Sequence, residues 1–254
     1  MSRIEVSAVT QLEKKLSSRA ERGICFCSVS GRALLILLLL AASMLAATKA
    51  AAQTYKLEKA AAPPPPALSA AVRDALQPEV LRVMGPRGLL CEVWLRKTLP
   101  AAAAPTDEPD VKMVRLAEGT LVGAMRLPGD TRDFRRQIIH AGVYTLRYIW
   151  QPPTADHLGL AEQRDFLLVA PAAIDANPAA VSHDDTIALS LKVTNTKHPS
   201  VWSLFQLAAG AGALPAVVRN EDNDTWMLGF QATLEGGGNP LRMGLVVVGH
   251  APEI

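Results

Sequence analysis

Residues 151–165 carry the side chains of this sequence that are best suited to chemistry, namely Asp156, His157, Arg164 and Asp165. A loop on a rigid sheet is a common place for binding residues, because the sheet fixes their position. The imidazole of His157 can ligate a metal or act as an acid or base. Side chains that are adjacent along a chain diverge, however, so Asp156 is a poor orienting partner for His157.

The same loop has a structural interpretation. Arg164 and Asp165 stand at the start of a predicted strand, where hydrogen bonds from them can clasp the loop to the sheet, with His157 as an anchor. Charged pairs of this kind are often structural rather than functional. Loop 151–165 is therefore predicted to be either a ligand-binding edge or a structural clasp, and no catalytic residue is assigned.

A second polar cluster, Ser182-His183-Asp184-Asp185, supplies side chains that metals use as ligands. His157, His183 and Asp185 together would form a His/His/carboxylate set of the kind that binds zinc or iron. None of these residues has the i, i+4 spacing of a zincin helix, so only the fold could bring them together. The competing interpretation is a solvated loop in which the aspartates cap turns. No cofactor is the preferred prediction, and a divalent metal is the alternative.

The chain lacks the short motifs of several large enzyme classes. It has no G-x-S-x-G nucleophile elbow and no phosphate-binding P-loop. Gly210-Ala211-Gly212 lacks the third glycine of a dinucleotide-binding fingerprint. The sequence therefore leaves open whether the protein is an enzyme and favours a non-catalytic role.

The first 52 residues have the layout of a secretory signal peptide. Residues 33–47 form an apolar run of fifteen, basic residues precede it, and Ala50-Ala51-Ala52 offers a cleavage site. The run is shorter than the roughly 18–20 apolar residues that span a bilayer. We therefore predict export to the periplasm or the outside, and an uncleaved inner-membrane anchor through residues 33–47 is the alternative.

The charge balance changes once this leader is set aside. Residues 1–52 hold seven of the 26 basic and three of the 24 acidic residues, so residues 53–254 carry a formal charge of about −2. A nucleic-acid partner is excluded on this ground, because non-specific binding to phosphates needs a basic excess. Cys25 and Cys27 belong to the leader, so Cys91 has no partner for an intramolecular disulfide and is predicted to be a core residue.

The remaining chain is predicted to hold an Ala/Pro-rich spacer at 53–78 and a β-rich domain at 79–254. The four consecutive prolines at 63–66 favour extended polyproline II, and residues 69–76 could form a short helix capped by Ser69. From Glu79 onward, short segments alternate between apolar and polar residues and are separated by turn-forming residues. They predict strands at 80–84, 89–97, 111–116, 120–127, 134–140, 143–150, 165–169, 187–193, 201–207, 216–218, 225–233 and 241–248.

These short strands at regular spacing favour an all-β fold, an antiparallel β-sandwich of about ten strands that is immunoglobulin-like or related. Two strands show the alternation clearly. In 89–97 the residues Leu89, Cys91, Val93 and Leu95 share one face. In 143–150 one face is aromatic and apolar, so it is predicted to meet the core, and it consists of Tyr144, Leu146, Tyr148 and Trp150.

Several motifs resemble those of a family of uncharacterised exported β-rich proteins from bacteria. The motifs are GVYTLRY at 142–148, HLG at 157–159, RDFLL at 164–168 and HPSVWSL at 198–204. They correspond to the pattern GxYTLRY, HxG, RDFLL and HPxxxSL, and they extend over most of 79–250. The resemblance implies an exported β-rich domain and draws attention to His157, Arg164, Asp165 and His198. It implies no reaction.

Taken together, the sequence predicts an exported binding or accessory module whose ligand is unknown. Its partner would be a protein or a saccharide at the cell envelope, and a membrane only if the leader is retained. The alternative is a metal-dependent extracytoplasmic enzyme that uses His157 with His183 and Asp185.

Overall fold

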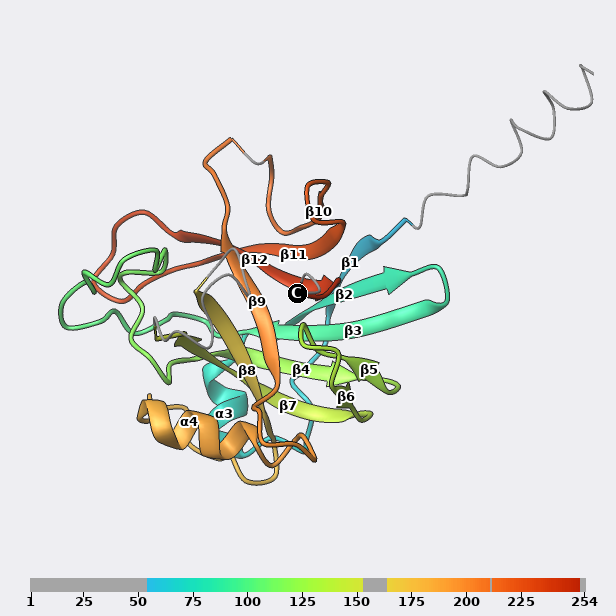
Figure 1. Ribbon diagram of the computed structural model, residues 1–254, viewed down its shortest axis with the longest axis horizontal. Coiled ribbons are helices and arrows are strands. Elements are labelled where there is room, and N and C mark those ends of the chain that lie inside the picture. The colour runs from blue at the N-terminus through green and yellow to red at the C-terminus, as the bar shows by residue number, and fades with distance from the viewer. Residues whose placement is uncertain (1–53, 153–163, 211, 252–254) are drawn as a thin grey trace, which may run out of the picture. The chain divides into compact units, whose positions relative to one another are not determined.

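The computed structural model describes residues 54–152, 164–210 and 212–251, all within the unit Gln53–Ile254. Within these ranges the chain forms a ten-stranded antiparallel sheet and a separate two-stranded sheet (Figure 1). The predicted antiparallel all-β fold is confirmed. The strands of the large sheet are hydrogen-bonded in one continuous order, so the core is enclosed by the curvature of this sheet.

The ten strands follow the spatial order β1-β2-β3-β4-β7-β8-β9-β12-β11-β10. Their bounds are β1 (Lys56–Ala61), β2 (Glu79–Gly85), β3 (Gly88–Leu95), β4 (Leu121–Leu127), β7 (Gly142–Trp150), β8 (Asp165–Pro171), β9 (Val201–Gln206), β10 (Ala216–Asn220), β11 (Thr225–Ala232) and β12 (Leu241–Val248). The small sheet pairs β5 (Thr131–Arg132) with β6 (Ile138–Ile139). The described helices are α3 (Ala70–Ala75) and α4 (His183–Ser190).

The large sheet curls until it is nearly barrel-like, and its two edge strands, β1 and β10, come into contact. Near this contact the rings of Tyr55 and Trp226 have their centroids 5.0 Å apart. The guanidinium carbon of Arg219 lies 5.7 Å from the centre of the Trp226 ring. Aromatic packing therefore joins the two ends of the sheet.

The main core fills the inside of the curved sheet and follows the alternation of side chains along the strands. In β3, Cys91, Val93 and Leu95 belong to this core, while Trp94 packs on the outer face. In β7 the inner face consists of Tyr144, Leu146 and Tyr148. The prediction for 143–150 is confirmed, with Trp150 partly buried against the same core. The prediction for 89–97 is confirmed for Cys91, Val93 and Leu95 but is wrong for Leu89, because the register of β3 on β2 shifts there and Leu90 packs against the core. Burial raises the pKa of the Cys91 thiol to about 12, as expected of a small core residue.

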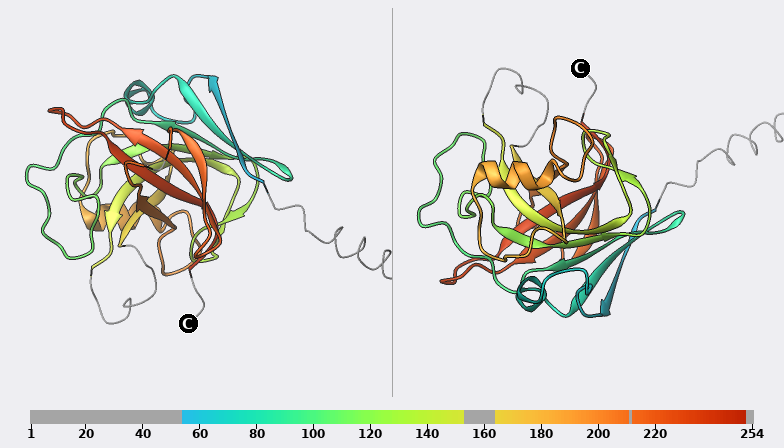
Figure 2. Two further views of the ribbon diagram at one scale, coloured as in Figure 1. Left: turned by 90° about the horizontal axis from the view of Figure 1, so that it is seen from above. Right: turned by 90° about the horizontal axis from the view of Figure 1, so that it is seen from below.

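The two described helices pack against parts of the outer face of the sheet (Figure 2). The side-chain oxygen of Ser69 caps α3 by accepting a hydrogen bond from the backbone N–H of Val72 at 3.1 Å. Val72 then packs with Trp94 and Leu121 in a second apolar cluster. Helix α4 lies against β8 and β7. The predicted helix at 69–76 is confirmed.

The prediction that 53–78 is only a spacer is wrong for its first part. Residues Lys56–Ala61 form β1, which pairs antiparallel with β2 from Lys56 opposite Met84 to Ala61 opposite Glu79. The alanines and the alternating charges of this segment suit an edge strand, where one face is solvated. The proline run begins only after the strand ends.

The predicted strand at 187–193 is also wrong, because most of it lies in or just after α4. The alternation of apolar residues there is genuine, but the helix start overrides it. Ser182 Oγ accepts a hydrogen bond from the backbone N–H of Asp185 at 3.1 Å and donates one to Asp185 Oδ2 at 2.7 Å. This reciprocal pair satisfies the first turn of a helix.

Two further predicted strands are absent or shortened because carboxylates hold their backbones in turns. At 111–116 the N–H groups of Lys112 and Met113 donate to Asp165 and not to a neighbouring strand. At 134–140 the carboxylate of Asp133 accepts from the N–H groups of Arg135 and Gln137, so only Ile138–Ile139 remains extended.

None of the described helices is long and apolar enough to cross a membrane. The predicted signal peptide or anchor lies outside the described residues.

Glu92 joins three neighbouring strands on the outer face of the sheet. It is 3% exposed and lies opposite Arg82 of β2 and Arg126 of β4. Arg82 Nε donates to Glu92 Oε1 at 2.8 Å, and Arg126 Nε donates to Glu92 Oε2. Burial alone raises the pKa of Glu92, but the hydrogen bonds and positive charges of Arg126 and Arg82 outweigh it and hold this pKa below its ordinary value.

We expect the stabilising contribution of Glu92 to depend on pH. Its folded pKa lies below the unfolded value of about 4.3, so the contribution is complete above that pH and is lost as the pH falls through the folded pKa. Urea unfolding between about pH 5 and pH 3 should therefore show a steeper loss of unfolding free energy in the wild type than in Glu92→Gln. Glu221→Gln, at an exposed position between β10 and β11, should keep the wild-type slope. Parallel curves for wild type and Glu92→Gln would contradict the assignment.

Candidate functional site

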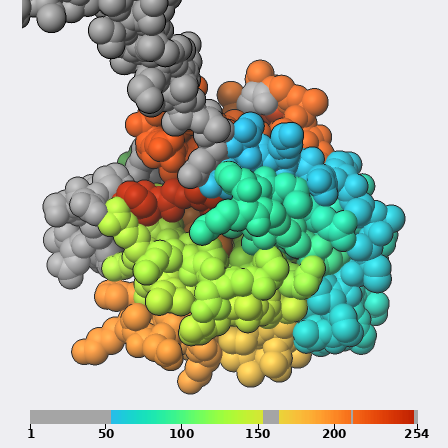
Figure 3. Space-filling view, turned by 90° about the vertical axis from the view of Figure 1, so that its right-hand side faces the viewer, coloured from blue at the N-terminus to red at the C-terminus, as the bar shows by residue number. Residues whose placement is uncertain are grey.

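An open groove of about 520 Å³ lies at one end of the curved sheet. It is bordered by the β2–β3 turn, the turn between β4 and β5, and β6, which gather on the face shown in Figure 3. Small-molecule sites commonly have volumes of about 300–1,000 Å³. The groove therefore has the size of a small-molecule site. Its lining consists of Tyr55, Gly85, Pro86, Arg87, Gly88, Leu89, Leu90, Pro128, Gly129, Asp130, Thr131, Arg132 and Ile138.

The β2–β3 turn places Arg87 at the rim of this groove. Gly85 pairs with Gly88, so Pro86 and Arg87 form the tip of the hairpin. Gly88 has a φ of +105°, a conformation that L-residues with a side chain rarely adopt. The Arg87 side chain is exposed and, within the described part of the chain, has no hydrogen-bond or ion-pair partner. The hairpin thus presents an uncompensated positive charge.

The opposite wall of the groove is held in place by Asp130. Its Oδ1 accepts from the N–H of Ala141 at 2.9 Å, and its Oδ2 lies 3.0 Å from His140 Nδ1. The hydrogen bond from Ala141, followed by that from His140, lowers the pKa of Asp130. Tyr144 supports the same turn, because its hydroxyl donates to the carbonyl of His140 at 2.8 Å. Both oxygens of Asp130 are therefore engaged in fixing the turn.

Asp133 fixes the small β5–β6 sheet, which brings Arg132 and Ile138 to the groove. The side chain is 1% exposed. Its carboxylate accepts from the N–H groups of Arg135, Gln137 and Val201 at 2.9, 2.8 and 3.0 Å. Burial raises the pKa of Asp133 although these bonds act in the opposite direction. The acceptors of this group are occupied by backbone, so its role is positional.

Arg164 of the sequence-predicted loop makes internal contacts. Its Nε donates to the carbonyl of Gln151 at 2.8 Å, which closes the base of the loop. Its two terminal nitrogens donate to Glu108 Oε2, at 3.2 Å, and to the carbonyl of Pro109. The guanidinium carbon lies 5.2 Å from the centre of the Trp150 ring. Arg164 therefore holds residues 108–109 against the base of loop 151–165.

Asp165 is fully buried and, like Arg164, makes internal contacts. Its Oδ2 accepts from the N–H of Lys112 at 2.8 Å, and its Oδ1 accepts from the N–H of Met113 at 3.1 Å. The hydroxyl of Tyr148 donates to Oδ1 at 2.6 Å. Burial and the nearby Asp165 charge raise the pKa of Tyr148, so this hydroxyl remains a donor. These contacts are those of a clasp between β8 and segment 112–113.

The proposed metal ligands are only partly described. Asp156 and His157 lie outside the described residues. His183, the first residue of α4, has its Nδ1 2.9 Å from Glu118 Oε1. Asp185 is hydrogen-bonded to Ser182, the N-cap residue of the same helix. No group of three His, Cys, Asp or Glu side chains that could hold a metal occurs within ranges 54–152, 164–210 and 212–251. The His157/His183/Asp185 set stays a prediction.

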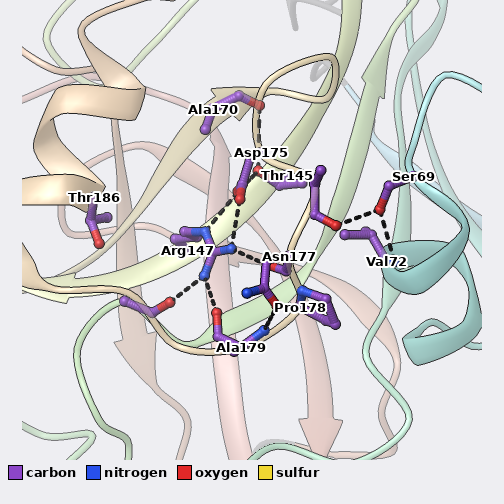
Figure 4. Close-up of polar contacts among 12 residues, drawn as sticks. Ser69, Val72, Thr145, Arg147, Ala170, Asp175, Asn177, Pro178, Ala179 and Thr186 are labelled. Carbon is purple, nitrogen blue, oxygen red and sulfur yellow. Dashed lines mark hydrogen bonds and ion pairs between the residues drawn. The ribbon is translucent and has the colours of Figure 1, made fainter.

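The most extensive buried polar centre surrounds Arg147 of β7, on the outer face of the sheet (Figure 4). Arg147 Nε and Nη2 donate to the two oxygens of Asp175 at 2.7 and 2.6 Å. The three remaining N–H groups donate to the carbonyls of Gly119, Asn177 and Ala179 at 2.6, 2.6 and 2.9 Å. All five guanidinium donors are therefore satisfied, which is what a buried arginine requires.

This centre anchors segment 175–181 to three other parts of the chain. Arg96 Nη1 donates to the carbonyl of Pro178 at 2.7 Å, and Ser69 Oγ donates to the carbonyl of Ala176 at 2.6 Å. Gly119 has a φ of +71°, and a Cβ there would lie 1.8 Å from the carbonyl oxygen of Val181. The segment therefore packs on Gly119 in a way that excludes any side chain at that position.

The Arg147 centre was not predicted from the sequence. The alternation in 143–150 places Arg147 on the face opposite Tyr148, and that face reads as solvated. The one available signal is that Arg147 and Thr145 share their face with the apolar Val143 and Ile149. A charged residue between apolar neighbours in a strand needs a buried counter-charge.

Comparison with known proteins gives no match: no protein-family model, no curated protein and no solved structure is similar to this chain. The resemblance of its motifs to a family of exported proteins therefore stays a prediction.

We expect Asp175→Asn to destabilise the fold strongly. Breaking one partner of a buried ion pair costs about 3–5 kcal/mol, because the other charge stays buried. The same change in an exposed pair, Asp224→Asn beside Arg219, should cost less than about 1 kcal/mol. Urea unfolding monitored by circular dichroism measures both. Similar losses in the two variants would show that the Arg147 centre is not a structural anchor.

Proposed function

We propose that this chain is an exported, non-catalytic binding module that takes a small ligand in the groove between the β2–β3 turn and the 128–132 turn. The observation that carries the proposal is the groove itself, which has the volume of a small-molecule site and a mixed polar and apolar lining. The apolar run at 33–47 and the cleavage-like alanines after it support export.

The distribution of buried charges supports binding at the groove over chemistry elsewhere. The polar atoms of three buried charged residues are hydrogen-bonded to backbone groups or to other internal partners; these residues are Asp133, Arg147 and Asp165. A catalytic group must leave an atom within reach of the substrate. The charged side chains at the groove, by contrast, include Arg87, which has no partner within the described residues.

The rim of the groove is fixed before a ligand arrives. Asp130 ties the 128–132 turn to residues 140–141, and Gln137 Nε2 donates to Asp133 Oδ2 and to the carbonyl of Pro199 at 2.8 and 2.9 Å. A site that is already ordered loses little conformational entropy on binding. Preorganisation of this kind suits a binding module.

Gly129 offers a direct way to block the groove. It lines the groove, and a Cβ added there would meet no atom within 4 Å. Gly129→Trp should therefore fill the groove and leave the fold unchanged. Gly210→Trp is the matched control, because Gly210 is equally open and lies outside the groove lining.

We expect a thermal-shift screen of the purified protein with sugars, amino acids, short peptides and amphiphiles to find a ligand that the groove binds. A ligand at a hundred times its Kd adds about 2.7 kcal/mol, which raises the Tm of a domain of this size by about 5–10 °C. The rise should appear in the wild type and in Gly210→Trp and should be absent in Gly129→Trp. A ligand that stabilises all three proteins equally, or a complete lack of stabilising compounds, would overturn the proposal.

A further inference from the structure

We infer that the groove takes a small anionic amphiphile, a molecule with one negatively charged headgroup and an aliphatic or aromatic body. The inference rests on the proposed function and adds the chemical class of the ligand to it. Its basis is the combination of two guanidinium groups with exposed apolar side chains around one groove.

The charges that line the groove favour an anion. Arg87 and Arg132 contribute two positive charges, and Asp130 contributes one negative charge. Both oxygens of Asp130 already interact with Ala141 and His140, and the three charged side chains together leave the lining with a net charge of +1. One terminal nitrogen of Arg132 donates to the carbonyl of Arg136 at 2.6 Å, which leaves its other nitrogens for a ligand. Arginine is well suited to carboxylate, sulfonate and phosphate groups.

The apolar part of the lining favours a body that is not a sugar. Ile138 is 51% exposed, although it is a large aliphatic side chain, and the half-buried Leu89 and Leu90 belong to the same lining. An exposed isoleucine in a concave site gains from contact with an apolar ligand.

Saccharide binding usually relies on an aromatic platform. In this groove the aromatic side chain is Tyr55, and its ring already packs against Trp226 at a centroid distance of 5.0 Å. The aliphatic residues and the arginines are therefore the main contacts that remain for a ligand. Their combination fits an amphiphile better than a neutral sugar.

Two fluorescent probes with the same ring system separate charge from apolar contact. 8-Anilinonaphthalene-1-sulfonate carries an anionic sulfonate, and N-phenyl-1-naphthylamine is its neutral counterpart. Each is titrated into the purified full-length protein, into Arg87→Gln/Arg132→Gln and into Gly129→Trp. The charge-matched control is Lys192→Gln/Lys197→Gln, which removes two exposed lysines that lie outside the groove lining.

We expect the sulfonate probe to bind about tenfold more weakly to the double arginine variant than to the wild type, because two partly exposed charge contacts are lost. The neutral probe should change less than about twofold there, and the lysine control should leave both probes unchanged within the same limit. Gly129→Trp should weaken both probes. Raising the salt concentration should weaken only the sulfonate probe.

Two results would overturn the inference in distinguishable ways. If Gly129→Trp weakens both probes but the arginine variant binds the sulfonate as well as the wild type does, the groove is a binding site for another class of ligand. If Gly129→Trp weakens neither probe, the groove is not a binding site, and the proposed function falls together with the inference.

Discussion

The fold of this chain depends on satisfying the five hydrogen-bond donors of the buried Arg147 guanidinium. A charge with no exposed surface is tolerated only when a counter-charge and acceptors surround it. Asp175 supplies the charge, and the carbonyls of Gly119, Asn177 and Ala179 supply the other acceptors. Satisfying them draws segment 175–181 across the outer face of the sheet. That segment leads into α4 and accepts a hydrogen bond from Ser69, the cap of α3, so the contacts of this arginine are linked to both helices.

Other buried charged side chains are also fully hydrogen-bonded within the protein, and this pattern indicates where a ligand can bind. Glu92 joins three strands, Asp133 closes the small sheet onto β9, and Asp165 holds segment 112–113. In each case the polar atoms are used up by internal partners. At the groove the pattern reverses: Arg87 lacks a partner among the described residues, and Ile138 is exposed. The buried charged side chains hold the strands and turns in place, and the groove end carries the side chains that can contact a ligand.

Much of the sheet could be predicted from the sequence, because period-two alternation reports burial directly. The inner faces of β3 and β7 follow from it. The wrong strand predictions occur where side chains form hydrogen bonds with backbone N–H groups that a strand would pair with its neighbour. Ser182 and Asp185 start a helix in a segment with strand alternation, and Asp165 bends 111–116 away from a strand through contacts with residues more than fifty positions away in sequence. The candidate groove was not predicted, since its walls come from turns that meet only in the folded chain. The loop that looked most functional contributes Arg164 and Asp165 to internal contacts.

We propose the groove end, in place of loop 151–165, as the ligand-binding surface of this protein. Hydrogen–deuterium exchange of the purified protein, with and without 8-anilinonaphthalene-1-sulfonate, can locate the bound probe because it reports on every segment at once. We expect slower exchange in peptides that cover 85–90 and 128–138, with 151–165 and 182–185 unchanged. Protection confined to 151–165 and 182–185, with none at the groove, would contradict it.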